Sequence, residues 1–433
     1  MNLKTVTILG ANGAMGCGIA AVFARAGARV YMVCRTEEKA NAAVQHACTL
    51  AKAEPGVLDL IPVSGGAATD ACVSASDLVF ESVAETYEAK REVLSRAAAS
   101  LRPDAVLASG TSGLSIARLA SFLPAAARPR FLGMHFFNPP LNLKLLELIP
   151  CADTERALTD ALGAYAASML GRAVVEVRDA PGFLANRIGF QFINRALQAC
   201  ERYAARGGVD YVDAVIGRFS GRNMPPVMTA DYVGLDIHSA IVKNLYENTC
   251  DYAHETFALP EYARKLLCAG RLGRKTNGGL YISQKLPDGT RKTDVYDVAS
   301  GAYRPARAYD FAFAEAMTAQ LAAGEHRAAF RALAEDSSQE GLLLVRALIE
   351  YVVYALFVGR EVSDIAAADH AMAAGFGWAS PLAVVEAFGG EAAFRALAQE
   401  RLCAPDAAAA DALLNDLPKS EYDYTQFFKI KAR

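Results

Sequence analysis

The sequence lacks a strong excess of charge of either sign. Its 44 Lys and Arg residues nearly balance 47 Asp and Glu residues, which gives a formal net charge of −3. Runs of roughly five or six like charges are also missing, so we expect neither a nucleic-acid track nor a polybasic membrane patch. Charged residues interrupt the apolar stretches, and no uncharged segment of about 18–20 residues predicts a membrane-spanning helix.

Paired cysteines are missing as well. The nine cysteines are scattered singly, and no Cys-x-x-Cys spacing occurs. An odd number of scattered cysteines suggests neither a disulfide framework nor a thiolate zinc site, so we expect reduced thiols and no bound metal. The first residues lack the long apolar core and the small-residue cleavage site of a signal peptide, and we therefore expect a cytoplasmic protein.

What the chain does have is length and a clear change of pattern near residue 180. At roughly 100–200 residues per domain, 433 residues predict about two to four domains. Residues 1–180 alternate short β-branched runs with helical patterns such as 15–27, 85–101 and 153–170. The predicted strands are 5–9, 29–33, 77–81, 105–108, 130–135, 143–148 and 173–178. This alternation predicts an α/β fold, a Rossmann-type doubly wound and mainly parallel sheet covered on both faces.

Helical patterns follow the Pro181-Gly182 breaker through most of the remaining chain. The first is an apolar helix from 183 to about 206, and a turn-rich stretch with strand patterning interrupts the helices after residue 283. The predicted parts are a Rossmann domain over 1–180, a helical domain over 181–283, a turn-rich β linker over 284–308 and a second helical domain over 309–433.

A weak internal repeat links the two helical parts. Residues 197–234 hold a helix, Asp213, a turn rich in glycine and proline, and another helix, and residues 354–389 repeat this order around Asp369. Duplication explains the shared order better than chance does, even in an alanine-rich chain. We therefore predict an all-α C-terminal region made of two related helical domains.

A glycine-rich loop follows the first predicted strand. Glycines allow a tight turn and a close approach of the backbone to a pyrophosphate, whose charge the N-terminus of the following helix stabilises. This loop lies between a strand and a helix at the start of a βαβ unit, which is the context that the motif requires, although Ala11 takes the place of its first glycine. We predict dinucleotide binding by Gly10, Ala11, Gly13, Ala14, Met15 and Gly16.

The end of the second predicted strand leaves the identity of the dinucleotide open. An Asp or Glu at this point normally accepts hydrogen bonds from the adenosine ribose, but the position here holds Cys34, followed by Arg35 and Thr36. A cationic corner that carries a hydroxyl group suits the 2′-phosphate of NADP. The other interpretation is an ordinary exposed loop in an enzyme that uses NAD.

Further polar residues lie where predicted strands end, at the edge where ligands bind in such folds. Residues 108–113 close one predicted strand and residues 133–140 close another. Glu147 lies inside a third, apolar strand, where an isolated carboxylate is costly unless it is paired. His135 is the expected partner, and a His–Glu pair beside a nicotinamide can take a hydroxyl proton while hydride leaves the same carbon. A histidine before two phenylalanines also fits a core residue without a catalytic role.

Several motifs resemble those of the L-3-hydroxyacyl-CoA dehydrogenases, in order and with that family's spacing over residues 1–283. They are Gly13-Ala14-Met15-Gly16-x-Gly18, Glu81 through Glu85 to Lys90, Ser109-x-Thr111-Ser112, His135-Phe136-Phe137-Asn138-Pro139, Asp179-x-Pro181-Gly182-Phe183-x-x-Asn186-Arg187 and Arg271-Leu272-Gly273 to Tyr281. The tail, with Gly375-Phe376-Gly377-Trp378, is similar to the longer bacterial form whose helical domain is duplicated. That form is often fused to an enoyl-CoA hydratase, of which this sequence shows no part.

The resemblance implies reversible oxidation of an (S)-3-hydroxyacyl-CoA to the 3-ketoacyl-CoA with NAD or NADP, in fatty-acid or related acyl-CoA metabolism. It implies His135 as the general acid/base and Glu147 as its orienting partner. Ser112 and Asn186 would hydrogen-bond the substrate's 3-oxygen, and Glu85 and Lys90 would contact the nicotinamide side of the cofactor. Arg35, Thr36, Ser112 and Asn138 complete the predicted cofactor site. The expected assembly is a homodimer, or a monomer whose two helical domains form an internal pseudo-dimer.

Departures from the family pattern leave two alternatives open. Gly110 replaces the Asn that is common in Ser-Asn-Thr-Ser, and Lys39 and Lys52 are the only lysines between residues 34 and 81, where the family uses a lysine-bearing helical hairpin to bind CoA. One alternative is therefore a dehydrogenase of free 3-hydroxy acids, of the sugar-acid or carnitine type. The other is a non-catalytic cofactor-binding or crystallin-like protein, against which the complete catalytic set argues.

Overall fold

The structure is a computed structural model that describes residues 1–217, 219–286 and 288–428. These residues form two compact units. Unit 1 comprises Met1–Leu184 together with Ala374–Phe376, and unit 2 comprises Ala185–Ala373 and the chain from Gly377 onward. The division between the units therefore falls close to the Pro181-Gly182 breaker, where the sequence changes from alternating strands and helices to helices.

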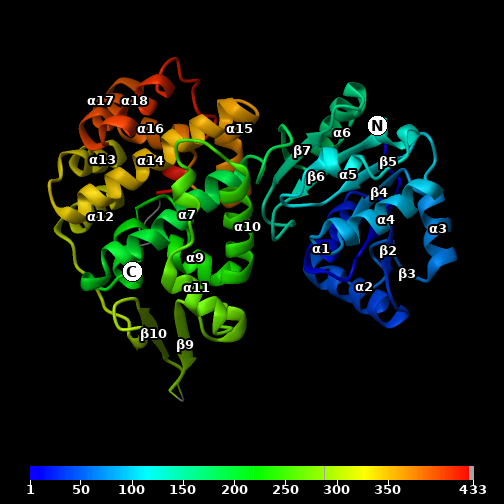
Figure 1. Ribbon diagram of the computed structural model, residues 1–433, viewed down its shortest axis with the longest axis horizontal. Coiled ribbons are helices and arrows are strands. Elements are labelled where there is room, and N and C mark those ends of the chain that lie inside the picture. Colours follow the sequence, from blue (N-terminus) through cyan, green and yellow to red (C-terminus); the bar gives the residue numbers. More distant parts are fainter. Residues whose placement is uncertain (218, 287, 429–433) are drawn as a thin grey trace. The chain divides into compact units, whose positions relative to one another are not determined.

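One eight-stranded sheet forms the centre of unit 1. Its strands are β1 (Thr5–Leu9), β2 (Arg29–Cys34), β3 (Leu60–Ser64), β4 (Leu78–Glu81), β5 (Val106–Ser109), β6 (Phe131–Phe136), β7 (Leu145–Pro150) and β8 (Ala173–Glu176). Their order is β3-β2-β1-β4-β5-β6-β7-β8, and all neighbours are parallel except β6 and β7 (Figure 1). Helical crossovers join the parallel strands, so the predicted Rossmann-type doubly wound sheet is confirmed.

Strand β3 is absent from the sequence prediction. Its Pro62 has no backbone N–H to donate, and a proline inside a short run argues against a strand. At the edge of a sheet this missing donor costs little, because only the side of β3 that faces β2 is paired. The omission matters because α3 (Gly66–Ala75), the helix after β3, forms one wall of the ligand cavity described below.

Helices cover both faces of this sheet. Besides α3 they are α1 (Ala14–Arg25), α2 (Glu37–Ala51), α4 (Tyr87–Ser100), α5 (Ile116–Ala120) and α6 (Arg156–Met169). Small and apolar residues of α1, α2 and α6 share one core cluster with the strands, while α3, α4 and α5 adjoin one another on the other face. A Cβ on Gly18 of α1 would lie 2.5 Å from Pro140 Cγ, so the turn between β6 and β7 rests directly on this helix.

Unit 2 is mainly helical. Its first helices are α7 (Ala185–Arg202), α8 (Val209–Val212), α9 (Pro226–Val233), α10 (Leu235–Asn248) and α11 (Glu261–Cys268). After a small sheet come α12 (Ala312–Ala322), α13 (His326–Glu335), α14 (Gln339–Val362), α15 (Ile365–His370), α16 (Pro381–Ala387), α17 (Glu391–Arg401) and α18 (Ala404–Leu413). The long apolar helix expected after residue 183 is α7, which ends at Arg202 rather than near 206.

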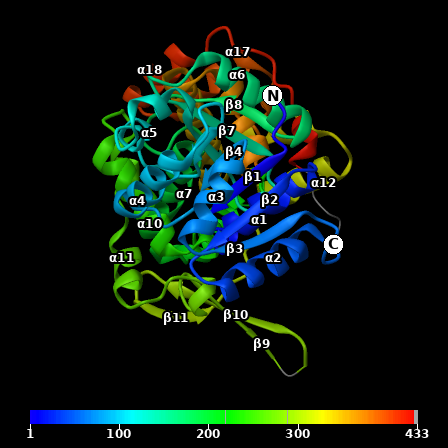
Figure 2. The ribbon, with the colours of Figure 1, turned by 90° about the vertical axis from the view of Figure 1, so that its right-hand side faces the viewer.

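The small sheet lies between these two sets of helices in the sequence. Its antiparallel strands are β9 (Tyr281–Lys285), β10 (Arg291–Asp297) and β11 (Ala302–Pro305), and β9 and β10 extend as a hairpin (Figure 2). The predicted turn at Ser300-Gly301 joins β10 to β11, whereas Pro287 of the other predicted turn lies outside the described residues. Arg304 fixes the sheet to α8 through an ion pair with Asp210 at 2.7 Å.

The two aspartates of the predicted repeat have the same structural role. Asp213 accepts hydrogen bonds from the backbone N–H groups of Val227 and Met228, in the first turn of α9. Asp369 accepts one from the backbone N–H of Leu382, in the first turn of α16. Each carboxylate therefore satisfies donors at a helix N-terminus, and both helices begin at a proline. This shared geometry supports a duplication of the helical region.

Helix α14 is long and apolar enough to cross a membrane by length and composition, and it is the one such helix among the described residues. Arg346 and Glu350 interrupt its sequence, and 72% of its most apolar window is buried inside the protein. It packs on α7, where the guanidinium of Arg187, 2% exposed, lies 2.9 Å from the carboxylate of Glu361. An internal pseudo-dimer requires such a contact between the first and the second set of helices. The oligomeric state of the protein stays a prediction.

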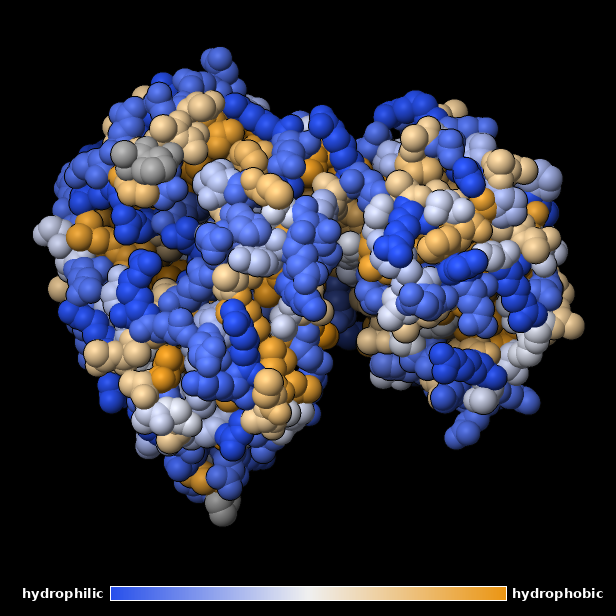
Figure 3. Space-filling view, in the orientation of Figure 1, coloured by the Kyte–Doolittle hydropathy of each residue, from blue (hydrophilic) through white to orange (hydrophobic). Residues whose placement is uncertain are grey.

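The face of the protein shown in Figure 3 is mostly hydrophilic, with small apolar groups scattered over both units. Among the described residues, exposed large apolar side chains include Val57, Met169 and Tyr232. Scattered apolar side chains of this kind are normal on protein surfaces and do not by themselves indicate an interface.

Acid is expected to destabilise unit 2 because of a buried histidine. His238 of α10 is fully buried, and burial lowers its pKa from 6.5 to about 3. Below pH 6.5 the unfolded chain therefore binds a proton that the folded unit excludes, so stability present above pH 6.5 is lost progressively as the pH falls toward 3. In scanning calorimetry, the melting temperature should fall over this range. The variant His238→Gln keeps a donor for Asn194 Oδ1, and its melting temperature should fall less steeply with decreasing pH. An equal dependence on pH in the two proteins would show that His238 is not the group responsible.

Candidate active site

The glycine-rich loop connects β1 to α1 at the carboxyl edge of the sheet. Gly10 has a φ of +83°, which favours glycine, and a Cβ there would lie 2.5 Å from the backbone oxygen of Ser82. The sharp turn thus falls on Gly10, and Ala11 at the motif's first position is fully buried. A Cβ on Gly16 would lie 2.7 Å from Gly10 O, so this glycine lets α1 start close to the strand. A Cβ on Gly13 would meet only Gly10 O, at 3.8 Å, which leaves this residue open to a ligand.

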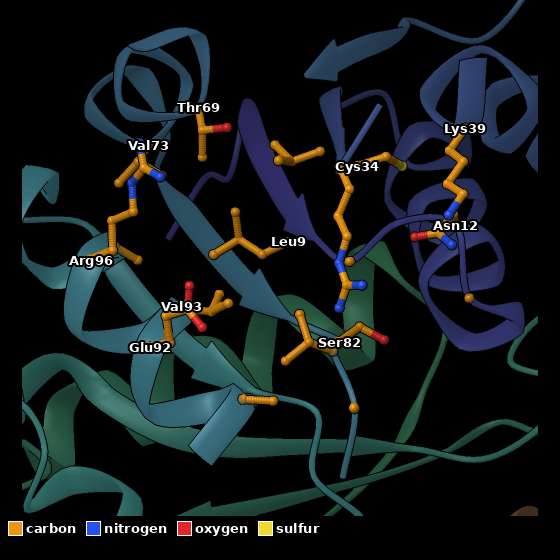
Figure 4. Close-up of a pocket in the computed structure, with 18 of the residues that line it drawn as sticks. Leu9, Asn12, Cys34, Lys39, Thr69, Val73, Ser82, Glu92, Val93 and Arg96 are labelled. Atoms are coloured by element: carbon orange, nitrogen blue, oxygen red, sulfur yellow. The ribbon is translucent and has the colours of Figure 1, made fainter. Parts of the chain in front are cut away.

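A cavity of about 600 Å³ opens beside this loop (Figure 4). The loop and the end of β2 form one wall with Asn12, Cys34 and Lys39, and α3 and α4 form the facing wall with Thr69 and Arg96. The predicted cofactor residues that line the cavity are Gly10, Gly13 and Arg35. The other predicted cofactor residues lie outside its lining, namely Ala11, Ala14, Met15, Gly16, Thr36, Glu85, Lys90, Ser112 and Asn138.

The loop and the cavity together fit a dinucleotide. Backbone N–H groups at the start of α1 and the positive end of its dipole favour a pyrophosphate, and the first turn of this fully described helix holds no acidic residue. The adenosine ribose of such cofactors lies at the end of β2, where Cys34 and Arg35 line the cavity. Among the residues that the structure describes, no group of three or more His, Cys, Asp or Glu could hold a metal ion.

A buried ion pair lies at the end of β4. Lys90 of α4 is 1% exposed, and its ammonium donates to both carboxylate oxygens of Glu81, at 2.8 and 3.0 Å. Glu81 is fully buried and also accepts hydrogen bonds from Ser109 Oγ at 2.6 Å and from the backbone N–H of Val83 at 2.7 Å. The same ammonium lies 3.2 Å from Glu85. Lys90, predicted as a cofactor contact, is therefore enclosed by two carboxylates, and its visible role is to position Glu85.

Glu85 connects this ion pair to the loop after β5. Its Oε1 accepts hydrogen bonds from Thr111 Oγ1 at 2.6 Å and from the backbone N–H of Ser112 at 2.7 Å. The side chain of Glu85 is 45% exposed, so it keeps a surface that a ligand can touch. The structure thus brings two predicted site residues, Glu85 and Ser112, into direct contact.

Packing explains why residue 110 is a glycine. A Cβ on Gly110 would lie 2.6 Å from Phe80 Cζ and 3.0 Å from the backbone oxygen of Glu81. Phe80 is fully buried and meets Phe136 edge-on, with ring centroids 5.8 Å apart, so its ring has no space to move aside. A larger side chain at residue 110 would therefore clash with the ring of Phe80 and crowd the backbone of Glu81.

The antiparallel pairing of β6 and β7 places His135 directly opposite Glu147. The distance from His135 Nδ1 to Glu147 Oε2 is 2.7 Å, and the two side chains are 5% and 0% exposed. Glu147 Oε1 also accepts a hydrogen bond from the backbone N–H of Leu184 at 3.2 Å, which holds the carboxylate in place. An ionised carboxylate only accepts hydrogen bonds, so Nδ1 carries the proton and Nε2 is the nitrogen that can exchange one with a ligand.

Two aromatic rings lie beside His135, and an arginine stabilises the turn that follows its strand. The ring centroids of Phe137 and Phe183 lie 4.5 and 5.7 Å from that of His135. Arg172, which lies outside the sequence motifs described above, donates from Nη1 to the backbone oxygen of Pro140 at 2.6 Å and to that of Leu143 at 3.0 Å. These two bonds hold the turn that joins β6 to β7. No local sequence pattern distinguishes Arg172 from other arginines, because its partners are backbone atoms distant in the chain.

The motif around residues 179–187 divides between the two units. Asp179 in unit 1 accepts hydrogen bonds from the backbone N–H groups of Ile116 and Ala117, at 3.0 and 2.8 Å, and thus stabilises the start of α5. Asn186 lies in the first turn of α7 in unit 2 and is 7% exposed. Its role beside the substrate stays a prediction.

Comparison with known proteins identifies the family. Residues 5–180 match the NAD binding domain of 3-hydroxyacyl-CoA dehydrogenase, and residues 182–283 match the C-terminal domain of the same enzyme. A probable 3-hydroxyacyl-CoA dehydrogenase of Bacillus subtilis is 30% identical over 307 residues, which are 70% of this chain, although they span 37% of that relative's length. A 3-hydroxybutyryl-CoA dehydrogenase of Bradyrhizobium diazoefficiens is 38% identical over 206 residues, or 47% of this chain and 67% of the relative.

A solved structure extends the likeness of fold to nearly the whole chain. The 3-hydroxybutyryl-CoA dehydrogenase of Escherichia coli covers 95% of this chain and 99% of its own, with a TM-score of 0.69 and 21% sequence identity. At this identity the likeness concerns the fold alone, and it includes most of the helical region after residue 283 that the two domain matches leave out. The two matched domains cover well over half of the residues. The chain therefore belongs to the 3-hydroxyacyl-CoA dehydrogenase family of oxidoreductases.

Proposed function

We propose that the protein catalyses the reversible oxidation of an (S)-3-hydroxyacyl-CoA to the 3-ketoacyl-CoA with a nicotinamide dinucleotide. The observation that carries this proposal is the buried His135–Glu147 pair, 2.7 Å apart, with His135 near the end of β6. The carboxyl end of β6 shares one sheet edge with the glycine-rich loop, and ligands of doubly wound sheets bind at this edge. The names of the relatives, 3-hydroxyacyl-CoA and 3-hydroxybutyryl-CoA dehydrogenases, support the substrate class.

In this proposal His135 is the general base of the oxidation. Glu147 holds the Nδ1 proton and stabilises the imidazolium, so Nε2 can accept the proton of the substrate's 3-hydroxyl as the carbonyl forms. The dinucleotide, when bound, supplies the acceptor for the hydride that leaves C3. In the reverse direction the imidazolium of His135 returns its proton to the 3-oxygen. Phe137 and Phe183 line the imidazole with apolar atoms, and low polarity strengthens its attraction to Glu147.

The other predicted residues support this chemistry from the sheet edge. Gly10 and Gly13, with the rest of their loop, would approach the pyrophosphate closely because no side chain stands in the way. Glu85, held by Lys90, would contact the nicotinamide side of the cofactor, and it orients the backbone of Ser112. We assign Lys90 to positioning rather than to direct contact, because its ammonium is buried between carboxylates.

The test compares a CoA thioester with its free acid. Purified protein is mixed with acetoacetyl-CoA or acetoacetate and with NADH or NADPH, and loss of the reduced nicotinamide is followed by absorbance. We expect turnover with acetoacetyl-CoA and none with acetoacetate, because the CoA moiety supplies binding energy that the small acid lacks. Turnover of acetoacetate alone would instead indicate a dehydrogenase of free 3-hydroxy acids. No turnover of any 3-ketoacyl-CoA across a series of chain lengths would contradict the proposal.

A further inference from the structure

The cavity beside the glycine-rich loop has an asymmetric charge distribution. Among its described lining residues, the two acids are Asp70 of α3 and Glu92 of α4, both on the wall that faces the loop. Asp70 is already paired with Arg96 at 3.1 Å. The other wall, at the end of β2, contributes Arg35 and Lys39 to the lining and no carboxylate. The corner where an adenosine ribose would lie is therefore cationic.

Cys34 occupies the point where a carboxylate would accept hydrogen bonds from both hydroxyls of a plain ribose. Its thiol is 6% exposed, and burial raises its pKa, so the group is a neutral thiol at physiological pH. A thiol is a weak hydrogen-bond acceptor and carries no charge that would repel a phosphate. The end of β2 thus lacks both the attraction for a 2′-hydroxyl and the repulsion of a 2′-phosphate that an acid would provide.

The backbone between the two cations is fixed by a helix cap. Thr36 precedes α2, and its Oγ1 accepts a hydrogen bond from the backbone N–H of Lys39 at 3.3 Å. This cap sets Lys39 in the first turn of α2, and Figure 4 shows its side chain extending toward Asn12 of the glycine-rich loop. Arg35 immediately precedes the cap and lines the same cavity. Both cations are exposed, and in the described part of the chain neither belongs to an ion pair.

We propose that this site prefers NADP(H) to NAD(H), with Arg35 and Lys39 binding the 2′-phosphate. The inference rests on the proposed dinucleotide-dependent function and specifies its cofactor. A phosphate monoester carries about −1.5 to −2 charges at pH 7, which two exposed cations on one wall can balance. Glu37 and Glu38 share the first turn of α2, but both are exposed and lie outside the cavity lining. They therefore do not occupy the ribose corner.

Direct binding measurements separate this inference from the catalytic one. NADPH, NADH and the fragments 2′,5′-ADP and 5′-AMP are titrated into the protein by isothermal calorimetry, without substrate. Because NADH lacks the 2′-phosphate that the two exposed cations would contact, NADPH should bind on the order of 10- to 100-fold more tightly than NADH. The fragment 2′,5′-ADP should exceed 5′-AMP by a similar factor. Both ratios should shrink at high ionic strength, because salt screens exposed charges.

Variants assign the preference to the two cations. Arg35→Gln and Lys39→Gln should each weaken the binding of NADPH and 2′,5′-ADP much more than the binding of NADH and 5′-AMP. Arg29→Gln is the matched control, because Arg29 starts the same strand β2 but pairs with Asp59 outside the cavity. Cys34→Asp should reverse the preference toward NADH. The melting temperature of Cys34→Asp is measured in parallel. If its buried carboxylate prevents folding, the preference is tested with Arg35→Gln instead.

The possible outcomes are distinct. Tighter binding of NADPH that disappears in Arg35→Gln and persists in Arg29→Gln supports the inference. Equal binding of the two dinucleotides, or tighter binding of NADH, overturns it and leaves the proposed dehydrogenase function intact. A preference for NADPH that survives both Arg35→Gln and Lys39→Gln overturns the assignment of these residues. If neither dinucleotide binds, the inference falls together with the proposed function.

Discussion

His135→Gln is expected to lower the turnover of acetoacetyl-CoA by roughly 10²- to 10⁴-fold, the usual contribution of a positioned general acid/base. The glutamine amide cannot exchange a proton with the 3-oxygen, whereas the glycine-rich loop and the cavity are untouched. The dissociation constants of the dinucleotides should therefore stay close to those of the parent. Steady-state kinetics gives the first quantity and calorimetric titration the second.

Glu147→Gln tests the same pair from the other side. The new amide group can donate to His135 Nδ1, which would place the ring proton on Nε2 and remove the nitrogen that accepts the hydroxyl proton. Turnover should fall and its pH profile should change, which a purely structural role would not produce. His46→Gln, at an exposed histidine of α2, is the matched control and should have no effect. Parental turnover in His135→Gln would exclude this residue as the acid/base.

Lys90→Met is expected to lower the free energy of unfolding of unit 1 by about 3–5 kcal/mol, because it leaves a buried carboxylate without its cation. Glu81 is 0% exposed, and the bonds from Ser109 and Val83 do not replace a charge. Urea unfolding of the parent and the variant measures the loss. Adding Glu81→Gln to Lys90→Met should recover part of it, since the remaining group is then neutral.

Arg96→Met provides the comparison on the same helix. Arg96 also belongs to α4 and pairs with Asp70 at 3.1 Å, but the two side chains are 53% and 41% exposed. An exposed pair contributes roughly 0–1 kcal/mol, so this variant should be much less destabilised than Lys90→Met. Similar losses of unfolding free energy in the two variants would show that burial does not increase the contribution of the Glu81–Lys90 pair to stability.

The sequence predicts well those parts of unit 1 that depend on local pattern. The glycine-rich loop can be recognised because all its glycines lie within a few residues of one another. Glu147 can be suggested as the partner of His135 because it is a single acid inside an apolar strand. The pair then follows from strand register, because the short turn between β6 and β7 sets the two residues opposite each other. Strand β3 is missed because a proline, Pro62, argues against a strand in its sequence. The helix α3 that follows it, which forms a wall of the cavity, is therefore missed as well.

Burial and contacts between residues distant in the chain could not be predicted from the sequence. Lys90 is predicted as a cofactor contact from the resemblance alone, and nothing in the local pattern reveals that its ammonium is enclosed by Glu81 and Glu85. Arg172 is not predicted at all, because its hydrogen bonds go to backbone oxygens. For Asp213 and Asp369 the repeat indicates that the positions correspond, but only the structure shows that each satisfies the start of a helix.

The contact between Gly110 and Phe80 couples the two positions energetically. With Phe80 in place, a Cβ at residue 110 would lie 2.6 Å from the end of the ring. The free-energy cost of adding a side chain at residue 110 should therefore depend on which residue stands at position 80. Because the two residues are in contact, the effects of substitutions at the two positions should not add.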